Sequence, residues 1–241
     1  MPDFVKLWIY LSSAPLFGLT ATLAVYLLAQ AFAARVHQAP WANPVLWSVV
    51  VLGCGLLVSK VPYENYFAGA QFIHFLLGPA VVALGLPLWE RRAELRATWG
   101  RLALAGLAGG GTAALMAVAL GWALGLPDDV VRSLAPKSIT APVAMGVAEK
   151  IGGVPALSAV FAVLTGLVGA LSGKYLFGWI GIGTDRLGWM ARGFALGTAS
   201  HGIGASRALS VQADAGAYAG LALGLQVLLG ALLIPLVARL F

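Results

Sequence analysis

A short run of the chain combines a cation, two hydroxyls and the start of a helix. Residues 136–142 are Pro-Lys-Ser-Ile-Thr-Ala-Pro. Thr140 is of a type that begins helices, and a proline two positions later fits the first helical turn, where no N–H is needed. The free amides and positive dipole end of such a helix attract anions, and Lys137 and Ser138 add a charge and a hydroxyl. Residues Pro136, Lys137, Ser138 and Thr140 therefore predict a binding site for a small anion.

The helix that follows is predicted to be too short to cross a bilayer, because two glycines at 152–153 end it. A lysine beside a half-length helix at membrane depth is costly, which favours a functional role for Lys137. The alternative is a solvated lysine in a surface loop. Glu149 lies about two and a half turns beyond Thr140. It is a candidate for proton coupling, with an interfacial salt bridge as the alternative.

A second candidate region is residues 197–207, Gly-Thr-Ala-Ser-His-Gly-Ile-Gly-Ala-Ser-Arg. Its last two glycines are expected to break a helix just after His201, which leaves backbone amides and carbonyls free for a ligand. Histidine changes charge near neutral pH, as proton coupling requires, although a packed, hydrogen-bonded histidine is the alternative. Arg207 adds a cation or marks a membrane edge. The substrate-binding candidates here are Ser200, His201, Gly202, Gly204 and Arg207.

The composition indicates that these residues lie in a membrane. The chain has 241 residues, 60% apolar and 10% charged, with a mean hydropathy of +0.90. Soluble domains carry roughly 25% charged residues. The net charge of +6 is spread thinly between apolar runs, so it does not indicate a nucleic-acid partner. We expect an integral membrane protein.

The apolar runs predict an all-α, polytopic fold. A spanning helix needs about 20 apolar residues. The runs of that length are 7–33, 102–126, 154–176 and 215–238, and two shorter ones are 45–59 and 72–89. With the interrupted segments near 133–150 and 191–209, this gives about 7–8 membrane segments in one transmembrane domain, residues 1–241. The first run is too long for a signal peptide and is predicted to be a span kinked at Pro15.

A weak similarity between two short segments of the chain suggests inverted repeats. Leu77-Gly78-Pro79 and Leu134-Ala135-Pro136 each precede an interrupted segment. Paired interrupted segments are typical of transporters with inverted repeats and broken or re-entrant helices. The predicted repeats are about 1–126 and 127–241, with chance as the alternative. The basic cluster in the loop 90–101 places that loop in the cytoplasm.

No sequence motif indicates catalysis. The chain contains no nucleophile elbow, no HExxH pair and no phosphate loop. Its one cysteine, Cys54, lies in an apolar run without metal-ligand spacing. We expect no enzyme, no catalytic residue, no cofactor and no metal site.

Three runs of the chain resemble the LrgB/CidB family of antiholin-like proteins, or murein hydrolase regulators. They are residues 76–89 (LLGPAVVALGLPLW), 133–153 (SLAPKSITAPVAMGVAEKIGG) and 191–209. The resemblance covers most of the chain from about residue 60, and the Pro-Lys-Ser and His-Gly-Ile-Gly runs are specific to the family. This chain has Ala141 and Ala205 where the family often has threonine, so no hydroxyl ligand is available at those two positions.

The resemblance implies one of two functions. Bacterial members are named for effects on autolysis, usually beside a smaller LrgA/CidA holin-like membrane partner. The plant relative is a plastidic glycolate/glycerate transporter, and bacterial relatives have been tied to pyruvate uptake. We expect a secondary transporter of small monocarboxylates in the bacterial inner membrane, of elevator type and homodimeric. The alternative is an antiholin-like regulator of murein hydrolase activity that acts with a holin-like partner.

Overall fold

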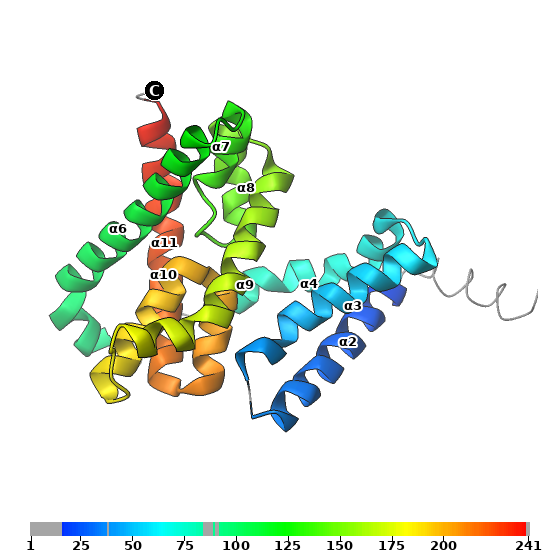
Figure 1. The fold of residues 1–241 in the computed structure, drawn as a ribbon, viewed down its shortest axis with the longest axis horizontal. Helices are drawn as coiled ribbons and strands as arrows, with labels where there is room; N and C mark the ends of the chain where they lie inside the picture. Colours follow the sequence, from blue (N-terminus) through cyan, green and yellow to red (C-terminus); the bar gives the residue numbers. More distant parts are fainter. Residues whose placement is uncertain (1–15, 38, 84–88, 90–91, 240–241) are drawn as a thin grey trace, which may run out of the picture. The chain divides into compact units, whose positions relative to one another are not determined.

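The structure is a computed structural model, and it describes residues 16–37, 39–83, 89 and 92–239. All the regular elements in these ranges are helices, and no strand occurs among them. The chain forms two compact units, residues 1–83 and 84–241 (Figure 1). Each unit is described by itself.

Three helices of the N-terminal unit lie within the described residues. They are α2 (Leu16–Arg35), α3 (Pro44–Ser59) and α4 (Tyr63–Ala83), with a 3₁₀ turn at Pro40–Ala42. Gly18 lets α2 approach the backbone of α4 at Tyr66, and the Thr22 hydroxyl lies 2.6 Å from the Tyr66 hydroxyl. The Asn43 side chain accepts hydrogen bonds from two amides in the first turn of α3. The unit is therefore a small helical bundle in which these contacts lie near the N-terminal ends of the helices.

In the C-terminal unit, the structure describes six helices in residues 92–239. They are α6 (Arg92–Ala123), α7 (Asp128–Leu134), α8 (Ala141–Lys150), α9 (Pro155–Trp179), α10 (Arg186–Val211) and α11 (Ala213–Ala238). Among the described residues, four helical segments are long and apolar enough to cross a membrane: Leu16–Arg35, Arg96–Ala123, Pro155–Trp179 and Ala213–Ala238. The chain is thus a multi-pass membrane protein.

The centre of the C-terminal unit is the contact between α10 and α11. A Cβ added to Gly193 would lie 2.0 Å from the Ala215 carbonyl oxygen, and one added to Gly197 would lie 2.1 Å from that of Ala219. The two helices therefore touch backbone to backbone, as the four-residue spacing of these glycines predicts. Further along α11, the buried Gln226 side chain donates a 2.7 Å hydrogen bond to the Gly106 carbonyl of α6. A glycine-lined, hydrogen-bonded core thus holds α6, α10 and α11 together.

The sequence-based spans agree with the structure where they can be compared. The runs 102–126, 154–176 and 215–238 correspond to α6, α9 and α11, and the run 45–59 corresponds to α3. The first predicted span begins at residue 7, and residues 7–15, with the kink expected at Pro15, lie outside the described residues. The all-helical membrane fold is confirmed for the described residues. The number of membrane segments and the inverted repeats stay predictions.

Candidate anion-binding site

The predicted half-helix is present as α8. It runs from Ala141 to Lys150, with Thr140 at its N-cap and a proline in its first turn. At its far end, Gly152 has a φ of +78°, a left-handed conformation that suits glycine. The Thr140 side chain makes no capping hydrogen bond. Its hydroxyl therefore does not use the amides at the start of α8.

Lys137 lies just before α8, in a connection packed into the C-terminal unit. Pro136 and Ser138 on either side of it are buried, while Lys137 itself is half-buried. The lysine Nζ donates a hydrogen bond to Ser138 Oγ over 3.2 Å. Ile139 fills the space that a side chain at Gly230 of α11 would need. The connection is thus a fixed part of the core, and its cation is next to a hydroxyl.

The second candidate region contains a break in α10. His201 has φ 42° and ψ −132° inside an otherwise helical run. The two following glycines predict a break just after His201, but the break is at His201 itself. A positive φ strains a non-glycine residue, and such strain persists only where the surroundings fix the conformation. The break is therefore held by its packing.

The packing around His201 comes from α9. Its Nε2 lies 2.7 Å from the Ala162 carbonyl oxygen, and its ring occupies the space where a Cβ of Gly166 would be. A carbonyl oxygen accepts only, so this hydrogen bond requires a hydrogen on Nε2. The other ring nitrogen, Nδ1, is then the one able to gain or lose a proton. The side chain is 4% exposed, and this position fixes both its orientation and its tautomer.

Two buried hydroxyls lie immediately before the break. Ser200 is 1% exposed and Thr198 is 6% exposed. Within the part of the chain that the structure describes, neither Ser200 Oγ nor Thr198 Oγ1 has a hydrogen-bond partner. Buried polar groups are normally paired, so each unpaired hydroxyl calls for an explanation. The sequence predicts Ser200 as a site residue but not Thr198. Thr198 lies four residues after Phe194 on the same helix face, and this position is the signal that could have indicated it.

The structure brings Lys137 and His201 together but separates other candidates from them. Ile139, two residues after Lys137, shares a buried cluster with Ala162 of α9, whose carbonyl oxygen contacts His201 Nε2, so the connection before α8 and the break in α10 meet against α9. Arg207 is half-buried, six residues past the break. Glu149 is exposed near the opposite end of α8 from Lys137.

The glycines of the second region have different surroundings. Gly204 is buried against the preceding turn of α10, where a Cβ would meet the Leu196 carbonyl oxygen at 2.5 Å. A Cβ at Gly202 would meet no heavy atom within 4 Å. Gly204 is thus explained by packing, whereas Gly202 leaves an open position beside the break. Among the described residues, no cluster of three or more His, Cys, Asp or Glu side chains suits a metal ion.

Comparison with known proteins identifies relatives over most of the chain. Residues 22–240 match the LrgB-like family. The uncharacterized protein YxaC of Bacillus subtilis is 34% identical over 212 residues, which cover 84% of this chain and 86% of YxaC. The holin-like protein CidB of Staphylococcus aureus is 29% identical over 213 residues, covering 87% of this chain and 91% of CidB. No solved structure matches. By its sequence and its relatives, the chain belongs to the LrgB-like family.

Proposed function

We propose that this chain is a secondary transporter of small monocarboxylates of the glycolate, glycerate, pyruvate or lactate class. The observation that carries the proposal is that the connection holding Lys137 and the break in α10 at His201 both reach Ala162 of α9. Two interrupted helical segments that meet near a cation are the arrangement expected for an anion site in a transporter. An oligomerising pore component would need neither interruption.

The carboxylate of the substrate would bind at the N-terminus of α8. Thr140 leaves the first amides of α8 without a side-chain cap, and the helix dipole favours a negative charge there. Lys137 would supply the counter-charge, with Ser138 as a second donor. Charge-assisted hydrogen bonds are roughly twice as strong as neutral ones. This combination suits a single carboxylate rather than a large or multiply charged ligand.

The polar groups of the substrate beyond its carboxylate would bind at the break in α10. Ser200 Oγ is buried without a partner among the described residues, and a hydroxyl or keto group of the substrate would give it one. Gly202 leaves room beside it. Discrimination by a buried hydroxyl is strong, because a substrate that lacks the matching group leaves it unpaired. Arg207 would lie on the far side of this break.

A proton is the proposed coupling ion. His201 Nδ1 is the ring nitrogen left to titrate when Nε2 donates to Ala162. Its charge would change with the occupancy of the neighbouring site, since Lys137 and a bound anion both act on it. Glu149, at the other end of α8, is a second candidate proton carrier.

The proposal extends to the architecture of the carrier. The elements that would lie in the membrane are α2, α3, α4, α6, the α7–α8 pair, α9, α10 and α11, in line with about 7–8 membrane segments. We propose inverted repeats at about 1–126 and 127–241, with an elevator-type movement of the substrate site. We also propose a homodimer in the bacterial inner membrane.

The second candidate function is an antiholin-like regulator of murein hydrolase activity. The observation that favours it is the name of the relatives, since the CidB proteins are called holin-like. In this case the chain would act with a small LrgA/CidA-like membrane partner, and Lys137 would contribute to assembly rather than to transport.

Counterflow of radiolabelled glycolate or pyruvate separates the two functions. Liposomes would contain only this protein, either as wild type or as Lys137→Ala, with Lys137→Arg as the variant that keeps the charge. We expect label to accumulate with wild type, to fall about 10- to 100-fold with Lys137→Ala, and to be partly kept with Lys137→Arg, since one hydrogen bond to a charged group contributes about 1.5–3 kcal/mol. Equal flux in wild type and Lys137→Ala would contradict the site.

A result of no flux in any sample would direct attention to the holin-like partner. Flux that appears only when the partner is added would indicate a two-component transporter. If the partner changes its oligomeric state without any flux, the regulator is supported and the transporter is contradicted.

A further inference from the structure

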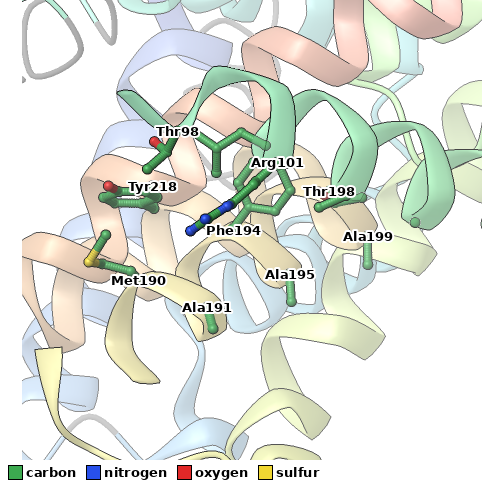
Figure 2. Close-up of a pocket in the computed structure, with 12 residues that line it drawn as sticks. Thr98, Arg101, Met190, Ala191, Phe194, Ala195, Thr198, Ala199 and Tyr218 are labelled. Atoms are coloured by element: carbon green, nitrogen blue, oxygen red, sulfur yellow. The ribbon is translucent and has the colours of Figure 1, made fainter. Parts of the chain in front are cut away.

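The C-terminal unit contains a cavity that the proposed transport site does not use. Its volume is about 610 Å³, and residues of α6, α10 and α11 line it (Figure 2). The α10 residues belong to the segment from Met190 to Ala199, ahead of the break at His201. The cavity is much larger than a three-carbon acid requires and is within the roughly 300–1,000 Å³ typical of sites for larger ligands.

Three polar side chains of this cavity gather at one end, while the Thr198 hydroxyl lies apart from them. Thr98, Arg101 and Tyr218 contribute two hydroxyls and a guanidinium, and Figure 2 shows the Arg101 guanidinium extending toward the side where Thr98 and Tyr218 lie. Arg101 is exposed and is in the first turns of the candidate span Arg96–Ala123. The cation is thus close to the point where α6 enters the membrane.

Most of the remaining lining is apolar and combines the larger side chains of Leu102, Met190 and Phe194 with alanines and Gly109. Ala105, Ala195 and Ala199 line the cavity, as do Gly109 and Thr198, where a Cβ at Gly109 would lie 3.0 Å from Thr198 Cγ2. Arg101 and Gly109 are eight residues apart on one helix, which corresponds to a length of about 12 Å. A cation at one end and an apolar stretch of this length suit an amphiphile that places one acyl chain in the cavity.

The basic residues at the start of α6 favour the cytoplasmic leaflet for the ligand. Arg92, Arg96 and Arg101 follow one another at the beginning of α6, and positively charged residues flank the cytoplasmic ends of membrane spans. The cytoplasmic leaflet carries anionic lipids, and basic pockets between membrane helices on that side bind their head groups. A zwitterionic lipid would bring a second positive charge next to Arg101.

We propose that this cavity is a binding site for an anionic phospholipid of the cytoplasmic leaflet. The lipid phosphate lies against Arg101, with the Thr98 and Tyr218 hydroxyls beside it. One acyl chain follows α6 inward as far as Gly109 and Thr198. The bound lipid would fill the space between α6 and the first part of α10, away from Lys137. This inference is independent of the transported substrate.

Lipid retention measures this site directly. The purified protein would be equilibrated with an equimolar mixture of phosphatidylglycerol and phosphatidylcholine, and the lipids retained would be counted by native mass spectrometry. We expect wild type to prefer phosphatidylglycerol and Arg101→Gln to lose about fivefold of that preference, which corresponds to about 1 kcal/mol for one basic residue near an anionic surface. Arg101→Lys keeps the charge and should keep most of the preference.

Two further variants make the assignment specific. Arg96→Gln removes the same charge from an exposed position on α6 outside the cavity, and should leave the preference unchanged. Ala105→Leu fills part of the apolar interior and should reduce retention of both lipids. Equal losses in Arg96→Gln and Arg101→Gln, or no preference in wild type, would overturn the site. Retention of oleate without retention of phosphatidylglycerol would overturn the phospholipid as its occupant.

Discussion

The two contacts that α10 makes through glycines serve different purposes. Against α11, Gly193 and Gly197 face the backbone carbonyls of Ala215 and Ala219. Against α9, Gly166 and Gly169 face side chains instead, namely the His201 ring and the Ser200 hydroxyl. The first contact brings backbone against backbone, whereas the second surrounds a strained residue and a hydroxyl that has no hydrogen-bond partner among the described residues.

The difference shows how one helix can be both framework and site. Where two helix backbones touch, no space is left for a side chain, so replacing the glycine with any other residue must push the helices apart. Where a polar side chain packs against a glycine, it occupies the space that a Cβ would fill, so the polar group can be buried there. The fold therefore depends on the glycines that face α11, and the proposed chemistry depends on the glycines of α9.

The largest effect on stability is expected from a substitution that disrupts the contact between α10 and α11. Gly197→Ala places a methyl group 2.1 Å from the Ala219 carbonyl oxygen, so α10 and α11 must move apart. Overpacking of this kind destabilises by about 1–3 kcal/mol, and backbone atoms relax poorly. We expect the midpoint of thermal unfolding in detergent to fall by several degrees. Gly224→Ala on α11, whose Cβ would meet no heavy atom within 4 Å, is the control and should leave the midpoint unchanged.

A substitution in the contact between α9 and α10 is expected to have a smaller effect on stability and a large effect on transport. Gly166→Ala presses a methyl group against the His201 ring at 2.8 Å, and the ring can shift more easily than a backbone can. We expect counterflow to fall about tenfold while most of the stability is kept, since a displaced ring loses its bond to Ala162. Gly178→Ala on the same helix has open space around its Cβ. Equal counterflow in the two variants would remove His201 from the mechanism.

The smallest expected effect is that of Thr140→Val. The Thr140 hydroxyl makes no cap bond, so its loss should not change the unfolding midpoint. If the hydroxyl binds substrate, the concentration for half-maximal counterflow should rise about threefold, as expected for one neutral hydrogen bond. A lower midpoint with unchanged transport would show that Thr140 serves the helix rather than the anion.

The sequence predicted those features that depend on local residue types. Apolar length located α6, α9 and α11, and the sequence around Thr140 located α8 within one residue at either end. The close approach at Gly193 and Gly197 followed from their spacing. These features follow from propensity, capping and small-residue packing, all of which act within one or two turns.

Other features depend on residues distant in the sequence. The break was expected at the glycines after His201, yet His201 carries the positive φ because α9 supplies Ala162 and Gly166 to hold it. Nothing near Gly166 in the sequence indicates that role. The cavity at Arg101 likewise requires three helices to be in place, and the sequence analysis interpreted that arginine only as part of a topology signal.

Substrate protection of a cysteine at the start of α8 tests the central claim most directly. Cys54, the one cysteine of the chain, would first be replaced by serine, and Thr140→Cys and Glu149→Cys would be made separately at the two ends of α8. Both would be treated with a small anionic methanethiosulfonate reagent. We predict that glycolate or pyruvate slows the modification of Thr140→Cys and leaves that of Glu149→Cys unchanged. No protection at Thr140→Cys, or equal protection at both positions, would contradict an anion site formed by Lys137 and the N-terminus of α8.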